Sequence, residues 1–286
     1  MNWHFRTIGM GTINYRAASR RLAQEAINTG LFVSSQGCTE SYIRNTNPEF
    51  WSQHRNVLGA KTPGFGWWLW KPEFILQNLL SINEGDGLLY LDAGSTIESD
   101  DDAVKEISNI MKLAETKLIL ASNSQPFIEK RYSSTQLLDL LNIDENDRNT
   151  NQFWAGCLFL VNCEYSRKII SDWKFLTCLD NHRYLLPPIT LEAECASFVH
   201  HMHDQAILSA LLKSAGIQSI DIGDRERPGA IRGVRHRFGF SYSERRRYVK
   251  LIPNILNFFS RTRLFILRRI VRDSLTRKPT THSLNF

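Results

Sequence analysis

The sequence predicts an α/β fold in which a mixed, mostly parallel sheet is flanked by helices. Three observations lead to this prediction. The chain has 286 residues, 42% of them hydrophobic, which is enough to bury a substantial core. Its opening segment follows a strand–helix–strand pattern, which is typical of parallel sheets. Later segments alternate short apolar runs with helical periodicity, so the same architecture is expected to continue along the chain.

The opening unit consists of strand 5–12, helix 15–30 and strand 31–35. The helical segment places Leu22 and Ala26 at helical spacing and stops at a glycine, which is common just past a helix end.

A second helix is predicted to begin at Lys71, because Pro72 fits the first turn of a helix. Phe74, Ile75 and Leu79 then form an apolar stripe. The tryptophan-rich stretch "GFGWWLW" stands directly before this helix.

The next strand, 87–92, is almost continuously apolar, as expected when both faces of a strand are covered, and it ends at Asp92. Residues 126–151 are polar and poorly periodic, so they are predicted to form a long loop or an insertion. The remaining predicted elements are, in order, helix 99–115, strand 117–122, strand 153–162, helix 164–179 and helix 200–216.

The basic charge of the chain is concentrated in residues 244–286. These residues carry eleven Lys or Arg against two acids, whereas the whole chain has a net charge of +6. The residues before them therefore carry a net charge of −3. We predict a globular domain at 1–243 and a basic C-terminal tail at 244–286, and the basic pI describes the tail alone.

Residues 255–271 of the tail predict an amphipathic helix. On a helical wheel, Arg261, Arg268 and Arg272 share a narrow arc and apolar side chains occupy the other side. Such a helix suits an anionic membrane surface. The alternative is a helix packed on the domain with its arginines in water. Nucleic acid is not expected as a partner, because phosphate contact does not require apolar residues at helical spacing.

The five cysteines indicate a reducing cytoplasm. They are odd in number and show no C-x-x-C spacing, so neither a disulfide framework nor a thiolate zinc site is predicted. The sequence also shows neither a basic leader followed by a long apolar run nor an uncharged apolar stretch of about eighteen residues. Secretion and membrane crossing are therefore not expected.

Asp92 is the first candidate for a functional role. It follows a buried strand, where α/β folds present ligand-binding groups, and Ala93, Gly94 and Ser95 are small enough for a ligand to approach. A carboxylate there is suited to coordinate a divalent cation on a diphosphate, because hard cations take oxygen ligands. The alternative is a carboxylate that only caps a turn or helix.

The preceding segment offers Trp67, Trp68, Trp70 and Lys71. Its tryptophans form either a stacking surface for a sugar or base or part of the core, and Trp70 is assigned to substrate binding. Lys71 is suited to neutralise a phosphate. A merely solvated lysine is disfavoured at the start of a helix by the helix dipole.

The stretch "HHMHDQ" opens the last predicted helix. Free backbone N–H groups and the positive end of the dipole favour anionic or hydroxyl-rich ligands at that point. His203 and Asp204 are the candidate contacts, with helix capping as the alternative for Asp204. His201 and His203 do not share a helical face, so a two-histidine metal site is not predicted.

Three motifs, in this order, resemble the landmarks of glycosyltransferases of the GT-A fold: "LLYLDAGS", "FWAGCLFLVN" and "HDQAILSALL". The likeness is nearest to the glycogenin and bacterial lipopolysaccharide galactosyltransferase type, and to relatives that carry "GYWxWKP" and "YLDAG". The motifs span residues 64–212, and the strand–helix–strand opening extends the likeness to residue 1. The resemblance implies that residues 1–243 form a Rossmann-like GT-A domain that binds a nucleotide sugar.

The resemblance also implies a cofactor. Asp92 matches the first aspartate of the D-x-D motif, which binds Mn²⁺ or Mg²⁺ together with the nucleotide diphosphate. Gly94 stands where the family has the second aspartate, which puts metal dependence in question. His236, in "GVRHRFG", is the available candidate for a further metal ligand.

The resemblance implies the catalytic residues as well. Asp204 matches an aspartate that binds hydroxyls of the donor sugar, and Gln205 matches a glutamine near the reacting carbon. Ala155 and Gly156 match a segment that approaches the sugar. Lys71 has no firm counterpart, so its proposed phosphate contact rests on its position alone.

The implied function is transfer of a hexose from a nucleoside-diphosphate sugar to a surface-glycan or lipid-linked acceptor, with retention of the anomeric configuration. The tail would hold such an enzyme at the cytoplasmic face of the inner membrane. The alternative is a non-catalytic carbohydrate- or nucleotide-binding module whose degenerate D-x-D motif has lost turnover.

Overall fold

A computed structural model describes residues 1–59, 62–220, 229–234 and 239 of the chain. These residues belong to one compact unit, Met1–Gly239. The predicted tail and His236 lie outside the described residues, so the predictions made for them remain predictions.

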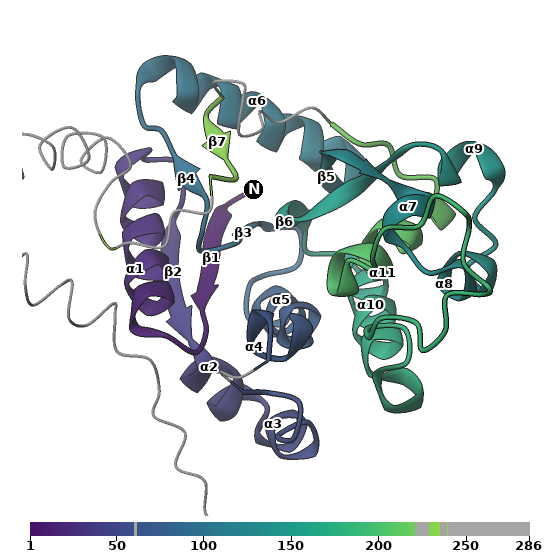
Figure 1. Cartoon of the computed structure of the whole chain (residues 1–286). Helices are drawn as coiled ribbons and strands as arrows, with labels where there is room; N and C mark the ends of the chain where they lie inside the picture. Colours follow the sequence, from purple (N-terminus) through teal and green to yellow (C-terminus); the bar gives the residue numbers. More distant parts are fainter. Residues whose placement is uncertain (60–61, 221–228, 235–238, 240–286) are drawn as a thin grey trace, which may run out of the picture. The chain divides into compact units, whose positions relative to one another are not determined.

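The centre of this unit is a five-stranded sheet with strand order β2-β1-β3-β6-β5 (Figure 1). Its strands are β1 (Trp3–Gly9), β2 (Ser34–Thr39), β3 (Gly87–Leu91), β5 (Ile119–Ile128) and β6 (Asn151–Val161). Strands β2, β1 and β3 pair in parallel, whereas β6 is antiparallel to both β3 and β5. The predicted mostly parallel sheet is confirmed. A second, two-stranded sheet joins β4 (Thr96–Ile97) to β7 (Ile231–Arg232).

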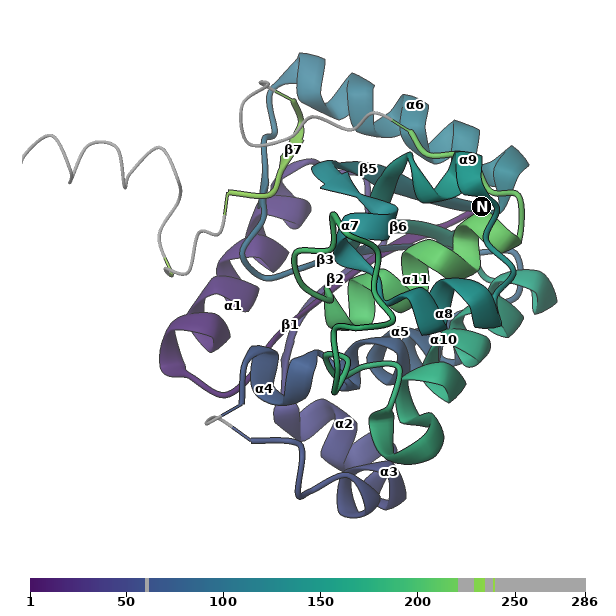
Figure 2. The same ribbon diagram turned by 45° about the vertical axis from the view of Figure 1, so that its right-hand side comes forward.

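Helices cover both faces of the large sheet (Figures 1 and 2). One face packs against α1 (Ile13–Asn28) and α6 (Asp101–Lys117). The other packs against α5 (Trp70–Leu80), α10 (Glu164–His182) and α11 (His203–Ser214). The shorter helices are α2 (Glu40–Thr46), α3 (Pro48–Gln53), α4 (Gly64–Trp67), α7 (Glu129–Tyr132), α8 (Thr135–Leu140) and α9 (Glu145–Arg148).

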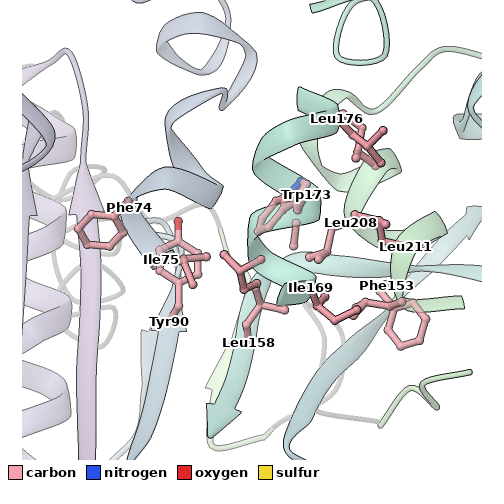
Figure 3. Packing of buried hydrophobic residues seen from close by; sticks show 14 of the residues in the cluster. Phe74, Ile75, Tyr90, Phe153, Leu158, Ile169, Trp173, Leu176, Leu208 and Leu211 are labelled. Atoms are coloured by element: carbon pink, nitrogen blue, oxygen red, sulfur yellow. The ribbon is translucent and has the colours of Figure 1, made fainter. Parts of the chain in front are cut away.

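Strand β3 shows why its sequence is continuously apolar. Leu88 and Tyr90 point into the core beneath α5 and α10, while Leu89 and Leu91 point into the core beneath α1 and α6. Successive side chains of a strand face opposite sides of the sheet, so a strand with two covered faces needs apolar residues at every position. Figure 3 shows the first of these cores, in which Tyr90 lies beside Phe74 and Ile75 of α5.

The predicted second strand lies a few residues too early: 31–35 was expected, and β2 spans Ser34–Thr39. Its sequence, SSQGCT, contains neither β-branched nor aromatic residues before its final threonine, so it carries little strand signal. A Cβ atom on Gly37 would lie 2.3 Å from the Ser19 carbonyl oxygen, so glycine permits the close packing of α1 on this strand.

The predicted loop at 126–151 is also wrong in part. It contains the three short helices α7, α8 and α9, of four, six and four residues. Helices of one or two turns are too short for an apolar face to recur, which is why periodicity did not reveal them.

Candidate functional site

Asp92 lies directly beyond the end of β3 and beside β6. Its backbone N–H donates to the Gly156 carbonyl oxygen at 2.9 Å. A Cβ atom on Gly156 would lie 2.8 Å from Asp92 Oδ2, so the glycine leaves room for this carboxylate. Ala155 is buried in the core next to it. Of the two residues predicted to approach the sugar, Gly156 is therefore the one that touches Asp92.

The loop that follows Asp92 is held by an arginine of α1. Arg21 donates from its Nη2 atom to the carbonyl oxygens of Ala93 at 3.0 Å and Ser95 at 2.8 Å. The Ser95 N–H closes a turn on the Asp92 carbonyl oxygen at 2.8 Å. Sequence reasoning missed Arg21, because a buried arginine on a helix gives no signal of the distant loop that it binds.

Lys71 connects Asp92 to Asp204. Its Nζ atom lies 3.2 Å from Asp92 Oδ1 and 2.8 Å from Asp204 Oδ2. The lysine is in the first turn of α5, where the helix dipole disfavours a cation, and the two carboxylates compensate for this. Asp204 is in the first turn of α11, where the dipole favours an anion. Three predicted site residues from three separate segments thus form one charged cluster.

Tyr90 is a fourth member of the cluster and was not predicted. Its hydroxyl donates to Asp92 Oδ1 at 2.7 Å. The signal was present in the sequence, because residues two apart in a strand face the same side. The tyrosine is fully buried, and it holds the carboxylate in one orientation.

The protonation equilibria of the cluster follow from burial and from mutual charge. Burial by itself would lower the pKa of Lys71, but Asp204 and Asp92 outweigh it and raise that pKa, which keeps the ammonium charged. Burial raises the pKa of Asp204 to about 6, against the opposing effect of Lys71. Burial, followed by the neighbouring Asp92 charge, raises the pKa of Tyr90 well above its usual value.

The cluster is accessible at one of its members. The side chains of Lys71 and Asp204 are 3% and 5% exposed, whereas that of Asp92 is 31% exposed. A ligand therefore reaches Asp92 first, and contact with Asp204 requires it to enter deeper.

The tryptophans divide into two roles. Trp70 is buried in the core, and its Nε1 atom donates to the Gly64 carbonyl oxygen at 2.9 Å. Trp67 and Trp68 are partly exposed, and their ring centroids lie 6.3 and 6.2 Å from that of His203. Trp67 and Trp68 are therefore better placed than Trp70 to make the substrate contact that was predicted for Trp70.

These two tryptophans stand in an unusual turn. All five residues from Gly64 to Trp68 have positive φ angles, including Phe65, Trp67 and Trp68. A non-glycine residue with such a positive φ angle costs on the order of 1 kcal/mol of stability. Backbone strain of this kind is concentrated at functional sites in proteins. The turn places the tryptophan rings beside His203 immediately before the chain enters α5.

The start of α11 is fixed by contacts on its backbone and side chains. The Trp173 indole N–H donates to the Asp204 carbonyl oxygen at 2.9 Å, and His203 Nδ1 lies 2.9 Å from the Leu185 carbonyl oxygen. Gln205 donates from Nε2 to Gln152 Oε1 at 2.8 Å. Met202 caps the helix without a side-chain hydrogen bond, and Asp204 pairs with Lys71, so Asp204 does more than cap the helix.

The described residues do not by themselves suit a divalent cation. No group of three or more His, Cys, Asp or Glu side chains in this part of the chain is arranged to hold a metal ion. Asp92 Oδ1 is already bonded to Tyr90 and Lys71, and Gly94 supplies no side-chain ligand. The proposed ligand pair of Asp92 and His236 stays a prediction, because His236 is not among the described residues.

Comparison with known proteins was made by sequence and by structure. No protein-family profile and no curated protein sequence matches the chain. The structure is similar to the apo form of mouse xyloside xylosyltransferase 1, with 6% identity and a TM-score of 0.41, over 79% of this chain and 87% of that one. It is also similar to galactosyltransferase LgtC in complex with donor and acceptor sugar analogues, with 13% identity and a TM-score of 0.43, over 81% and 86% of the two chains.

A third similar structure is a glycosyltransferase involved in glycosylation of the major capsid of the virus PBCV-1. It has 10% identity and a TM-score of 0.42, over 88% of this chain and 100% of that one. All three likenesses have TM-scores below 0.5, so the function proposed below rests on the residues of this chain.

Among the described residues, none of the helices combines the length and the hydropathy that spanning a bilayer requires.

Proposed function

We propose that this chain is a glycosyltransferase that moves a hexose from a nucleoside-diphosphate sugar to a surface-glycan or lipid-linked acceptor, with retention of the anomeric configuration. The observation that carries the proposal is the Lys71 ammonium held between Asp92 and Asp204. Fixed charges of both signs, next to an accessible carboxylate and a close-packed glycine, suit a ligand that combines hydroxyls with a diphosphate.

The reaction needs both kinds of charge. When the bond between the anomeric carbon and the diphosphate breaks, negative charge grows on the leaving group and positive charge grows on the sugar. Lys71 is proposed to stabilise the leaving diphosphate. Asp204 is proposed to bind donor hydroxyls and Gln205 to border the reacting carbon. The acceptor oxygen forms the new bond to the anomeric carbon and gives its proton to the leaving diphosphate. Gln205, the residue proposed to border the carbon, is an amide and not a carboxylate nucleophile, and no step here is assigned to a metal ion.

The donor is identified by a screen of binding and turnover. Purified protein is mixed with UDP-, GDP- and CMP-sugars, and thermal unfolding and nucleotide release are measured. A bound donor raises the unfolding temperature, because it binds only the folded chain. The proposal predicts that at least one donor does so and is also cleaved. Binding of donors without release, with every acceptor tried, would instead support the non-catalytic binding module.

The tail is proposed to bring the enzyme to anionic lipid at the inner face of the membrane, where a lipid-linked acceptor would be found. Flotation with vesicles of neutral and anionic lipid tests this directly. The full chain should float with anionic vesicles, and a chain that ends at Ser243 should not. Equal recovery of the two would remove the membrane proposal and leave the transfer reaction untouched.

A further inference from the structure

A cavity lies between α3, α5 and α10. Its volume is about 460 Å³, which is within the usual range of small-molecule sites. Phe50 of α3, Leu76 of α5 and Phe175 of α10 form its apolar lining. Leu76 is five residues after Lys71 on α5, so the two side chains point to different sides of that helix. The cavity and the charged cluster at Lys71 therefore lie on different sides of α5.

The lysine that lines the cavity, Lys174, is already paired within the protein. Its Nζ atom lies 2.6 Å from Oε2 of Glu73, whose side chain is fully buried. The other oxygen of Glu73 accepts from Asn47 Nδ2 at 2.7 Å and from Gln77 Nε2 at 2.9 Å. Lys174 Nζ also lies 5.5 Å from the centre of the Phe50 ring. The ammonium is thus fixed at the cavity wall, and its charge is balanced there.

His54, another lining residue, adds no positive charge. Its Nδ1 atom lies 3.0 Å from Nε2 of His182. Burial, followed by the charges of His182 and Lys174, lowers the pKa of His54 to about 4, so the ring is neutral near pH 7. Glu49 then supplies the remaining formal charge of the lining, which is negative. A phosphate or carboxylate ligand is disfavoured in such a cavity, because like charges repel.

The lining offers both an exposed ring and neutral polar groups. Phe175 is 61% exposed, whereas Trp173 and Leu176 of the same helix are buried. Gln53 and Ser171 add side chains that can donate and accept hydrogen bonds. A pyranose sugar has matching chemistry, since it carries C–H groups on one face and hydroxyls around its edge.

We propose that this cavity is a second binding site, and that it takes an uncharged sugar unit of a glycan. The Phe175 ring covers the C–H face of the sugar, and Gln53 and Ser171 bind its hydroxyls. The site holds a glycan apart from the reaction cluster. It does not depend on the catalytic roles proposed for Lys71 and Asp204.

The first test measures binding of maltose, cellobiose and lactose by saturation-transfer NMR. Phe175→Ala removes an exposed side chain, so it should cost little stability, but it should raise the dissociation constant at least about fivefold. Tyr165→Ala is the matched control, because Tyr165 is 41% exposed on the same helix and does not line the cavity. It should change the constant less than about twofold. Absence of binding by all three sugars, or equal constants for the two variants, would overturn the proposal.

The second test fills the cavity. Ser171→Trp should abolish sugar binding, whereas Lys168→Trp, which adds the same ring at an exposed position of α10, should preserve it. Thermal unfolding of each variant checks that it is folded. Asp204→Asn should bind the sugars as the wild type does. Binding that is lost in Asp204→Asn and kept in Ser171→Trp would place the sugar at the charged cluster and overturn the proposal.

The charge of the ligand is tested with glucose, glucuronate and glucosamine. Glucose should bind more tightly than glucuronate, because the lining has a negative charge in excess. Tighter binding of glucuronate, or binding of the cationic glucosamine alone, would contradict a site for uncharged sugars. A chain that binds sugars here but releases nucleotide from no donor would contradict the glycosyltransferase and would still support this second site.

Discussion

Lys71 Nζ lies 2.8 Å from Asp204 Oδ2 and thereby joins the first turn of α5 to the first turn of α11. The same ammonium contacts Asp92, so two carboxylates from distant parts of the chain share one cation. With two carboxylates and one lysine, the cluster contains one more formal negative charge than positive charge when all three groups are ionised.

Replacing Lys71 by methionine should destabilise the folded chain. Removing one partner of a buried ion pair leaves an uncompensated charge and costs about 3–5 kcal/mol. Lys168→Met is the matched control, because Lys168 forms an exposed pair with Asp172 on α10 and such pairs contribute less than about 1 kcal/mol. Urea unfolding measures both variants. Equal midpoints for the two would show that the Lys71 bridge contributes little to folding.

The affinity for Mn²⁺ should rise when the lysine is neutralised. In the wild-type chain the ammonium competes with any cation for Asp92, whereas Lys71→Gln leaves two carboxylates without a positive partner. We expect Mn²⁺ to bind the variant about tenfold more tightly, because nearby opposite charge favours binding. Isothermal titration with Mn²⁺ alone gives both constants. An unchanged or weaker affinity in Lys71→Gln would mean that cations do not bind at these carboxylates.

Gly156→Ala should weaken donor binding. The added methyl group would lie 2.3 Å from Trp154 Nε1 and 2.8 Å from Asp92 Oδ2, so the ring and the carboxylate must move. Gly59→Ala is the control, since a Cβ atom there meets nothing within 4 Å. With the donor found by the screen, the dissociation constant should rise about tenfold or more in Gly156→Ala and stay within about twofold in Gly59→Ala, as expected when reacting groups are displaced. Similar constants for the two variants would argue against a ligand at Asp92.

His201 should make stability depend on pH. Ser134 N–H donates to His201 Nδ1 at 3.2 Å, and Nε2 lies 2.9 Å from the Tyr184 carbonyl oxygen, so the ring is held neutral with its proton on Nε2. Burial, followed by the nearby charge of His203, lowers the pKa of His201 to about 3. The unfolded chain takes up this proton near pH 6.5, so the stability is complete above that pH and is lost as the pH falls toward 3.

Between pH 7 and pH 5 the free energy of unfolding should fall by about 2 kcal/mol, because the unfolded chain takes up a proton on His201 and the folded chain does not. His201→Gln keeps a donor and an acceptor but does not titrate. The difference in unfolding free energy between the wild type and this variant should therefore shrink by about that amount over the same interval. A difference that does not change with pH would show that His201 titrates alike in both states.

Much of the fold was predictable because its strands and long helices carry strong patterns. Strand β3 was recognised from its continuous apolar residues, because both of its faces are buried. Helices α6 and α10 were recognised from their helical periodicity, because each buries one apolar stripe. Strand β2 was displaced because its small polar residues give no such pattern. The short helices between β5 and β6 were missed because one or two turns cannot show a period.

The candidate site was predictable only in outline. Asp92 and Asp204 were identified because each stands at the boundary of a strongly patterned element. That Lys71 pairs with both carboxylates depends on where α5 packs against the sheet, which no local pattern encodes. Arg21 and Gln152 make buried contacts between distant segments, so their part in the site becomes visible only in three dimensions.

The most direct test of the central claim compares nucleotide release by the wild type, Asp204→Asn and Asp172→Asn with the donor found by the screen. Asp172 is an exposed aspartate on α10 and serves as the control. We predict that Asp204→Asn lowers the release rate at least about a hundredfold while remaining folded, as expected for a group that binds the reacting sugar, and that Asp172→Asn changes it little. Release by folded Asp204→Asn at the wild-type rate would contradict the account.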